Sequence, residues 1–111
     1  MKKTFDIAAL EEFHHLLDQT GKRHKFHRFP RGYINKEFAA FAPHHEMQLF
    51  HAYLPDGTLD ASAIIVFYGN MACYRHGASL GANKRLPSSY ALQWEAIKEA
   101  KSRGCKLYDF W

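Results

Sequence analysis

The chain has 111 residues, of which 47% are hydrophobic and 15% aromatic, and its formal net charge is +4 at pH 7. This length supports one domain with a modest core, and the apolar content excludes an intrinsically disordered chain. The sequence has no apolar run near the roughly 20 residues of a membrane span and no signal-type segment after Met1, so it predicts a soluble, cytoplasmic protein.

Two helices are predicted in the N-terminal part of the chain. The first spans about residues 6–20, behind the capping residue Asp6, and Thr20-Gly21 predicts its end or a kink. Its apolar face, at helical spacing, comprises Ile7, Leu10, Phe13, His14 and Leu17. The second helix spans about residues 33–41 and is stopped by Pro43. Its predicted apolar side comprises Tyr33, Phe38 and Phe41.

A meander of three antiparallel strands is predicted next, over about residues 47–53, 59–68 and 71–78. The turn signals Pro55-Asp56-Gly57 and Gly69-Asn70 separate these strands. The middle strand is almost entirely apolar, which predicts a central position covered on both faces.

The C-terminal part predicts a helix over about residues 88–103 and a strand over about 106–111. The helix has a broad apolar arc made of Tyr90, Leu92, Trp94, Ala96, Ile97 and Ala100. Its polar residues predict the ion pairs Glu95–Lys98 or Glu99–Arg103. A helical crossover usually connects parallel strands, so the last strand is expected to lie parallel to a meander strand. The fold class is therefore α+β.

The loop from Ser79 to Ser89 joins a strand to a helix, and such junctions bind anions through free backbone N–H groups and the helix dipole. Lys84 and Arg85 suit a phosphate, yet the GK[ST] motif of a phosphate-binding loop is missing. The acetyl-CoA signature [RQ]xxGx[GA], counted from Arg75, also fails at Ala78. The alternative is an ordinary polar loop in which Gly77 and Gly81 serve turns.

Other side chains allow both a functional and a structural interpretation. Phe26 and Phe29 lie among basic residues and either stack on nucleic acid bases or anchor a loop to the core. The hydroxyls of Tyr74, Tyr90 and Tyr108 either contact a polar ligand or belong to core rings. Asp109 lies near a strand end and has two interpretations. It acts as an acid or organises a phosphate-binding loop, or it has only a structural role as a cap or as the partner of an Arg or Lys.

The cysteines and histidines predict no special chemistry. Cys73 and Cys105 are lone thiols, which suits a reducing compartment. The histidine pairs His14-His15 and His44-His45 are adjacent and point in different directions, and His24-x-x-His27 has no third ligand at a recognisable spacing. No metal site is expected.

Three segments carry a resemblance to a known family: YRHGAS, KRLPSSYALQWEAIKEAKSRG and KLYDFW. Together they resemble the Fem-type (FemAB/FemX) aminoacyltransferases that build peptidoglycan bridges. The resemblance implies a GNAT-like (N-acetyltransferase-like) fold with a mixed sheet. It extends weakly upstream through Phe13, Leu17, Thr20, Arg23, Phe26 and Tyr33.

The resemblance also implies a function. Such enzymes take an amino acid from aminoacyl-tRNA and join it to the amine of a UDP-linked or lipid-linked muropeptide, without metal or CoA. Lys84, Arg85 and Tyr90 are then expected to contact substrate phosphate and sugar-peptide, and Tyr108 to line the same groove. The protein would be cytoplasmic, including a peripheral position at the inner face of the membrane.

The family continues past YDFW with glycine and further elements, among them a lysine tied to catalysis. The resemblance therefore predicts a C-terminally truncated fragment of one domain, with that lysine expected beyond Trp111. Two alternatives stay open. One is a CoA-dependent N-acetyltransferase of the same fold, and the other is a non-catalytic fragment that binds RNA or a protein partner.

Overall fold

A computed structural model describes residues 2–24, 31–79 and 88–109 of the chain. Its central element is a five-stranded sheet in the order β1-β2-β3-β4-β5. The strands are β1 (Lys2–Thr4), β2 (Met47–Tyr53), β3 (Leu59–Tyr68), β4 (Met71–Ser79) and β5 (Leu107–Asp109). β1 to β4 pair antiparallel, and β5 pairs parallel with β4. The predicted meander and the parallel last strand are confirmed.

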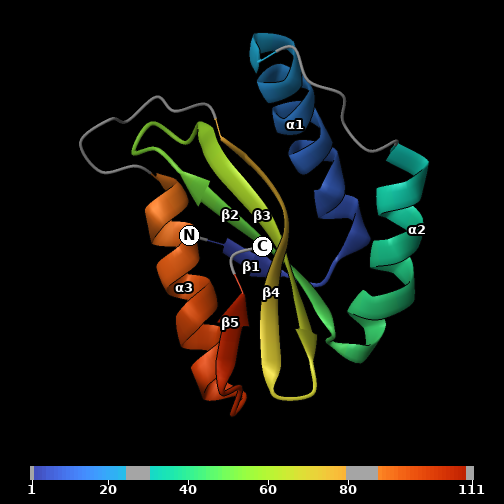
Figure 1. The fold of residues 1–111 in the computed structure, drawn as a ribbon. Helices are drawn as coiled ribbons and strands as arrows, with labels where there is room; N and C mark the ends of the chain where they lie inside the picture. Colours follow the sequence, from blue (N-terminus) through green and yellow to red (C-terminus); the bar gives the residue numbers. More distant parts are fainter. Residues whose placement is uncertain (1, 25–30, 80–87, 110–111) are drawn as a thin grey trace.

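Helices cover both faces of this sheet. The 3-10 helix η1 (Ile7–Ala9) leads into α1 (Leu10–His24), and α2 (Arg31–Phe41) leads into η2 (Ala42–His44). The crossover helix α3 (Ser88–Ser102) precedes β5. Figure 1 shows α1 and α2 on one side of the sheet and α3 on the other. The predicted α+β class with a mixed sheet is therefore confirmed.

The core is divided between the two faces because side chains alternate along each strand. Leu49 of β2 and Ile64 of β3 pack with α1 and α2, whereas their neighbours Phe50 and Ile65 pack with α3. The middle strand β3 is thus apolar on both faces and nearly fully buried, as its sequence predicted.

The first helix differs from its prediction at both ends. Asp6 does cap the chain, accepting a hydrogen bond from the Ala8 backbone N–H, but it caps η1, and Ile7 in this short segment is 47% exposed. Beyond residue 20 the helix continues to His24, so Gly21 neither ends it nor breaks it. A single glycine costs a helix about 1 kcal/mol, which a well-buried helix face can offset.

The second and third helices bury different residues from those predicted. In α2 the buried pair is Ile34 and Phe38, four residues apart, while Tyr33 and Phe41 are exposed. In α3 Trp94 is 61% exposed, outside the buried stripe of Leu92, Ala96 and Ala100. Small alanines bring α3 close to the sheet, so its buried stripe is narrower than its apolar content suggested.

β1 was not predicted from the sequence, and the last strand begins at Leu107, one residue later than predicted. β1 has only three residues, two of them lysines, so it carries no alternating apolar pattern. Its partner β2 supplies the pairing instead, through Lys3 opposite Phe50. Within the described residues β5 ends at Asp109, and residues 110–111 lie outside them.

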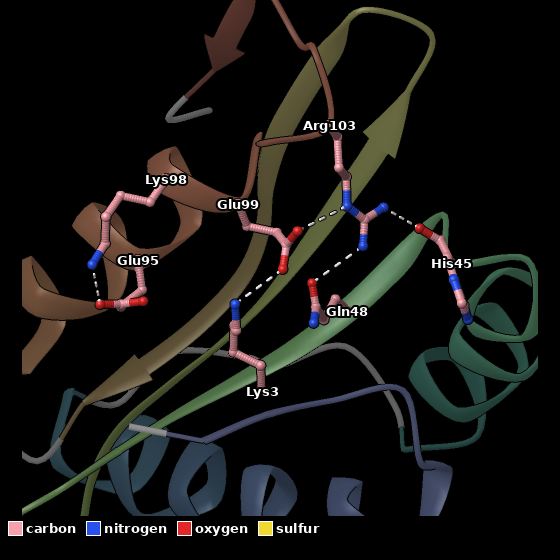
Figure 2. Close-up of polar contacts among 7 residues, drawn as sticks. All are labelled: Lys3, His45, Gln48, Glu95, Lys98, Glu99 and Arg103. Atoms are coloured by element: carbon pink, nitrogen blue, oxygen red, sulfur yellow. Dashed lines mark hydrogen bonds and ion pairs between the residues drawn. The ribbon is translucent and has the colours of Figure 1, made fainter. Parts of the chain in front are cut away.

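Arg103, just after α3, fastens the C-terminal end of that helix to the N-terminal half of the chain (Figure 2). Its guanidinium donates to Glu99 Oε2 at 3.4 Å, to Gln48 Oε1 at 3.3 Å and to the backbone carbonyl of His45. The same group lies 3.8 Å from the ring centroid of Phe67, a cation–π distance.

Glu99 links this contact to the sheet edge, because its other oxygen accepts from Lys3 Nζ at 3.1 Å. The predicted pairs Glu95–Lys98 and Glu99–Arg103 are both present (Figure 2). The Arg103 cluster is Arg103 with its partners Lys3, His45, Gln48, Phe67 and Glu99. It joins four segments that are far apart in sequence: β1, the start of β2, β3 and the end of α3.

Candidate active site

The site is built around a β-bulge in β4. Ile65 of β3 pairs with Tyr74, but the next residue back, Ile64, pairs with His76, so Arg75 is an extra residue on the bulged strand. A bulge bends a strand and changes the direction in which its side chains point, which is why bulges recur beside active sites. Tyr74 packs with the α3 layer, whereas His76 contacts α2.

On the α2 side, Glu37 gathers two side chains from the bulge. Its carboxylate accepts from Arg75 Nε and from an Arg75 terminal nitrogen, both at 3.3 Å, and lies 3.3 Å from His76 Nε2. Arg75 also donates to the Tyr33 hydroxyl at 3.2 Å. We call Tyr33, Glu37, Arg75 and His76 the bulge cluster.

The charges of the bulge cluster follow from burial and pairing. The Glu37 hydrogen bond raises the pKa of Arg75, so the guanidinium stays positive. Burial lowers the pKa of His76, against the opposing effect of Glu37, so the imidazole is mainly neutral at pH 7. We therefore interpret the His76–Glu37 contact as a hydrogen bond in which the protonated Nε2 donates.

Exposure separates the roles in this cluster. His76 is only 7% exposed, so it serves as a positioning residue for Glu37. The Arg75 side chain is 25% exposed and is held by Glu37 from α2. A positioned guanidinium offers several N–H donors in one plane and binds carboxylate, phosphate or a developing oxyanion. Arg75 is thus the group in this cluster best placed to meet a substrate.

On the α3 side, Tyr74 lies across Gly77. A Cβ atom at Gly77 would collide with the Tyr74 hydroxyl and ring, so only glycine fits there. The predicted turn role of Gly77 is therefore wrong, because the residue lies within β4 and makes room for a tyrosine. Tyr108 of β5 packs against the same core and donates from its hydroxyl to Gln93 Oε1 at 2.6 Å.

Both tyrosines keep their protons at physiological pH. Burial raises the pKa of Tyr74, and burial together with the neighbouring Tyr74 raises that of Tyr108. A phenol of this kind donates a hydrogen bond but cannot act as a base at neutral pH. The α3 side of the sheet thus carries neutral tyrosine hydroxyls, whereas the α2 side carries a fixed cation.

Of the four predicted substrate-binding residues, the structure describes one side chain in full. Tyr108 is half-buried beside Tyr74, as just described. Lys84 and Arg85 lie outside the described residues, as do Phe26, Phe29 and Gly81. Tyr90 lies in the first turn of α3, and its side chain is outside them. The roles assigned to Lys84, Arg85 and Tyr90 remain predictions.

The bulge cluster was not predicted as a site from the sequence. Arg75 and His76 are part of the YRHGAS segment, but their partner Glu37 is 38 residues away from Arg75. A lone glutamate on a predicted helix carries no signal of such a contact. The one usable signal was a polar Arg-His pair inside a strand that otherwise packs on both faces.

A family model described as an acetyltransferase (GNAT) domain matches residues 3–111 of the chain. The chain belongs to this GNAT family. The match covers nearly every residue, including the bulged β4, α3 and β5, and makes the chain a domain of acyltransferase type. No curated protein gives a significant match.

Several of the described histidines of this GNAT domain have individual partners. His14 Nε2 lies 2.8 Å from Asn35 Oδ1, and His51 Nδ1 lies 2.9 Å from Ser62 Oγ. The His45 ring stacks on Phe5. Among the residues that the structure describes, no three His, Cys, Asp or Glu side chains form a group suited to a metal ion.

Cys73 and Cys105 are both free thiols. Burial and the nearby Asp109 carboxylate raise the pKa of Cys73, which makes this thiol a poor nucleophile. None of the described helices is both long and apolar enough to cross a membrane.

Proposed function

We propose that this GNAT domain forms amide bonds by moving an aminoacyl group from aminoacyl-tRNA to the primary amine of a muropeptide precursor. The resemblance of its YRHGAS, α3 and KLYDFW segments to Fem-type enzymes supports this, within the GNAT family to which the chain belongs. The structural observation that supports it best is Arg75, a permanent cation held by Glu37 at the bulge of β4.

Aminoacyl transfer needs a fixed positive charge near the reacting carbonyl, and Arg75 at the bulge is such a charge. The acceptor amine attacks the ester carbonyl carbon, a C–N bond forms, and negative charge develops on the carbonyl oxygen. The ester C–O bond then breaks, and the ribose hydroxyl leaves with the proton that the amine gives up. Fixed positive groups near the developing oxyanion lower this barrier without reorganisation. We assign that role to Arg75, with Glu37 and His76 as positioning residues.

The remaining parts of the proposal come from the resemblance. Lys84, Arg85 and Tyr90 contact the phosphate and sugar-peptide of the acceptor, and Tyr108 lines the groove. No metal or CoA takes part, since aminoacyl-tRNA supplies an activated ester. The domain works in the cytoplasm and reaches lipid-linked acceptors as a peripheral protein at the inner membrane face.

The direct test uses the 111-residue chain with aminoacyl-tRNA, charged with a labelled amino acid, and a UDP-linked muropeptide. Mass spectrometry should detect a muropeptide heavier by one aminoacyl residue. Arg75→Gln should abolish most of the product, whereas Lys98→Gln, at the exposed Glu95–Lys98 pair, should leave it unchanged. Equal product from both variants would remove Arg75 from the mechanism.

A CoA-dependent N-acetyltransferase is the second candidate, and the description of the matching family favours it. Saturable acetyl-CoA binding in a calorimeter, followed by acetylation of an amine, would support this candidate over aminoacyl transfer. A third candidate is a non-catalytic RNA-binding fragment, consistent with the net charge of +4. Strongly salt-dependent tRNA binding without any transfer would support that one.

A further inference from the structure

A cavity of about 500 Å³ lies between α1 and the start of β3. Two leucines supply its apolar part and polar side chains its rim. Its lining residues are Glu11, Glu12, His15, Leu16, Gln19, Thr58 and Leu59. This volume suits a small organic group.

The floor of the cavity belongs to the protein core. Leu16 is 1% exposed and packs in the same cluster as Ala78, near the end of β4, and Leu59 packs against that cluster. The cavity therefore lies on the sheet face that also carries the bulge cluster, the side of α1 and α2 in Figure 1. A ligand with an aliphatic stem would bury that stem against the two leucines.

The two glutamates of the rim differ in their partners, since one is paired with a cation and the other with a neutral hydroxyl. Glu11 accepts from Arg31 at 2.9 and 3.0 Å, so its charge is offset by a cation. Glu12 instead accepts from the Tyr53 hydroxyl at 3.0 Å. That bond orients the Glu12 carboxylate without neutralising it, because a phenol is uncharged. A carboxylate can accept about four hydrogen bonds, so Glu12 has capacity for a further donor.

We infer that this cavity binds the alkylammonium group of a ligand, with the ammonium at Glu12 and the aliphatic stem on Leu16 and Leu59. Gln19 and Thr58 add neutral polar groups at the rim. If the ligand is the acceptor, which rests on the proposed function, the bound ammonium is not the amine that reacts, because a nucleophilic amine must be uncharged. The acceptor would then carry two amines, and the cavity would select that class of substrate.

The test measures binding directly, without an acyl donor. The full chain is titrated with n-pentylammonium, and amide chemical shifts are followed by NMR at constant pH and ionic strength. Saturable shifts should map to residues 11–19 of α1 and to Thr58 and Leu59. Pentanoate and 1-pentanol keep the stem but change the charge, and both should bind more weakly. Equal binding of pentanoate, or shifts elsewhere on the surface, would overturn the inference.

Two variants test whether binding depends on the negative charge of Glu12. Glu12→Gln keeps the shape of the side chain and should weaken pentylammonium binding about five-fold, as expected for a partly exposed ion pair. The matched control is Glu95→Gln on α3, which removes the same charge at a site remote from the cavity. Unchanged affinity in Glu12→Gln, or an equal loss in both variants, would refute the site. The wild-type shift map stands whether or not Glu12→Gln folds.

This experiment separates the cavity from the proposed function. If pentylammonium binds at Glu12 but no amide product forms in the transfer assay, the cavity stands and the proposed function fails. If transfer proceeds and a diamine acceptor is used equally well by wild type and Glu12→Gln, the cavity has no part in acceptor selection.

Discussion

Two arginines of this domain have nearly the same exposure, 25% for Arg75 and 24% for Arg103, and each donates to a glutamate. Their surroundings differ. Arg103 lies on the Phe67 ring and donates to the His45 carbonyl and to Gln48 as well as Glu99. Arg75 sits on a bulged strand and is held through Glu37 and Tyr33 of α2.

The partners of the two arginines indicate that Arg103 stabilises the fold, whereas Arg75 is suited to bind a substrate. The partners of Arg103 come from segments far apart in sequence, so its contacts add to the packing of α3 on the sheet and oppose unfolding. Those of Arg75 anchor the guanidinium at a local distortion of a strand, which is how fixed charges are presented to a ligand. Exposure alone would not have separated the two roles.

The largest expected effect is on activity. Arg75→Gln should lower kcat/KM for acyl transfer by about 10²–10³-fold, the usual cost of losing a preorganised oxyanion donor. Its thermal unfolding should change little. Steady-state kinetics and a melting curve on the same sample measure both. A large loss of stability with normal activity would reverse the comparison of the two arginines.

Arg103→Ala should show the opposite behaviour. Losing the cation–π contact and the charged hydrogen bonds should lower the free energy of unfolding by about 2–3 kcal/mol. Urea denaturation at pH 7 measures this. Lys98→Ala, which breaks the exposed Glu95–Lys98 pair, is the control and should cost no more than about 0.5 kcal/mol. Similar costs for the two variants would show that the Arg103 cluster adds nothing beyond a surface ion pair.

Gly77→Ala tests the packing of β4 on its other face, where Tyr74 lies against Gly77. The new Cβ would meet the Tyr74 ring, so we expect a destabilisation of about 1–3 kcal/mol from overpacking. Combining Gly77→Ala with Tyr74→Leu should recover part of that loss, and a double-mutant cycle measures the coupling. Strictly additive effects would contradict the close contact between the two residues.

The smallest effect is a pH dependence of stability. Burial lowers the pKa of both His76 and His51 below 6.5 in the folded chain. Well above pH 6.5 both are neutral in the folded and the unfolded chain, so they add no pH dependence there. Below it the unfolded chain takes up protons that the folded chain does not, and stability falls. Denaturation midpoints between pH 7.5 and 5 should show this, with a smaller slope in His76→Asn. A flat profile would mean that the two histidines have the same pKa in the folded and the unfolded chain.

Much of the fold could be predicted because each element has its own local pattern. The meander follows from alternating apolar runs between turn residues, and α3 follows from an apolar stripe between Pro87 and Gly104. β1 could not be found, since Lys2 and Lys3 form a strand only by pairing with β2. Trp94 shows a second limit. Helical spacing identifies apolar positions, but tertiary packing decides which of them are buried.

The candidate site was harder to predict because it depends on contacts between distant segments. Tyr108 was named from a resemblance, and its half-buried place beside Tyr74 is compatible with a groove. The bulge at Arg75 depends on the register between β3 and β4, which the residues of β4 alone do not reveal. Glu37 acquires its role only when α2 packs over that bulge.

His45 connects the segment that carries Glu37, the partner of Arg75, to Arg103. It has a left-handed backbone (φ 60°) at the end of η2, just after α2, and its carbonyl accepts from Arg103. The helix that holds Arg75 through Glu37 is thereby fastened to the end of α3. Slow amide hydrogen exchange should consequently be lost from α2 and the last turn of α3 in a single cooperative opening.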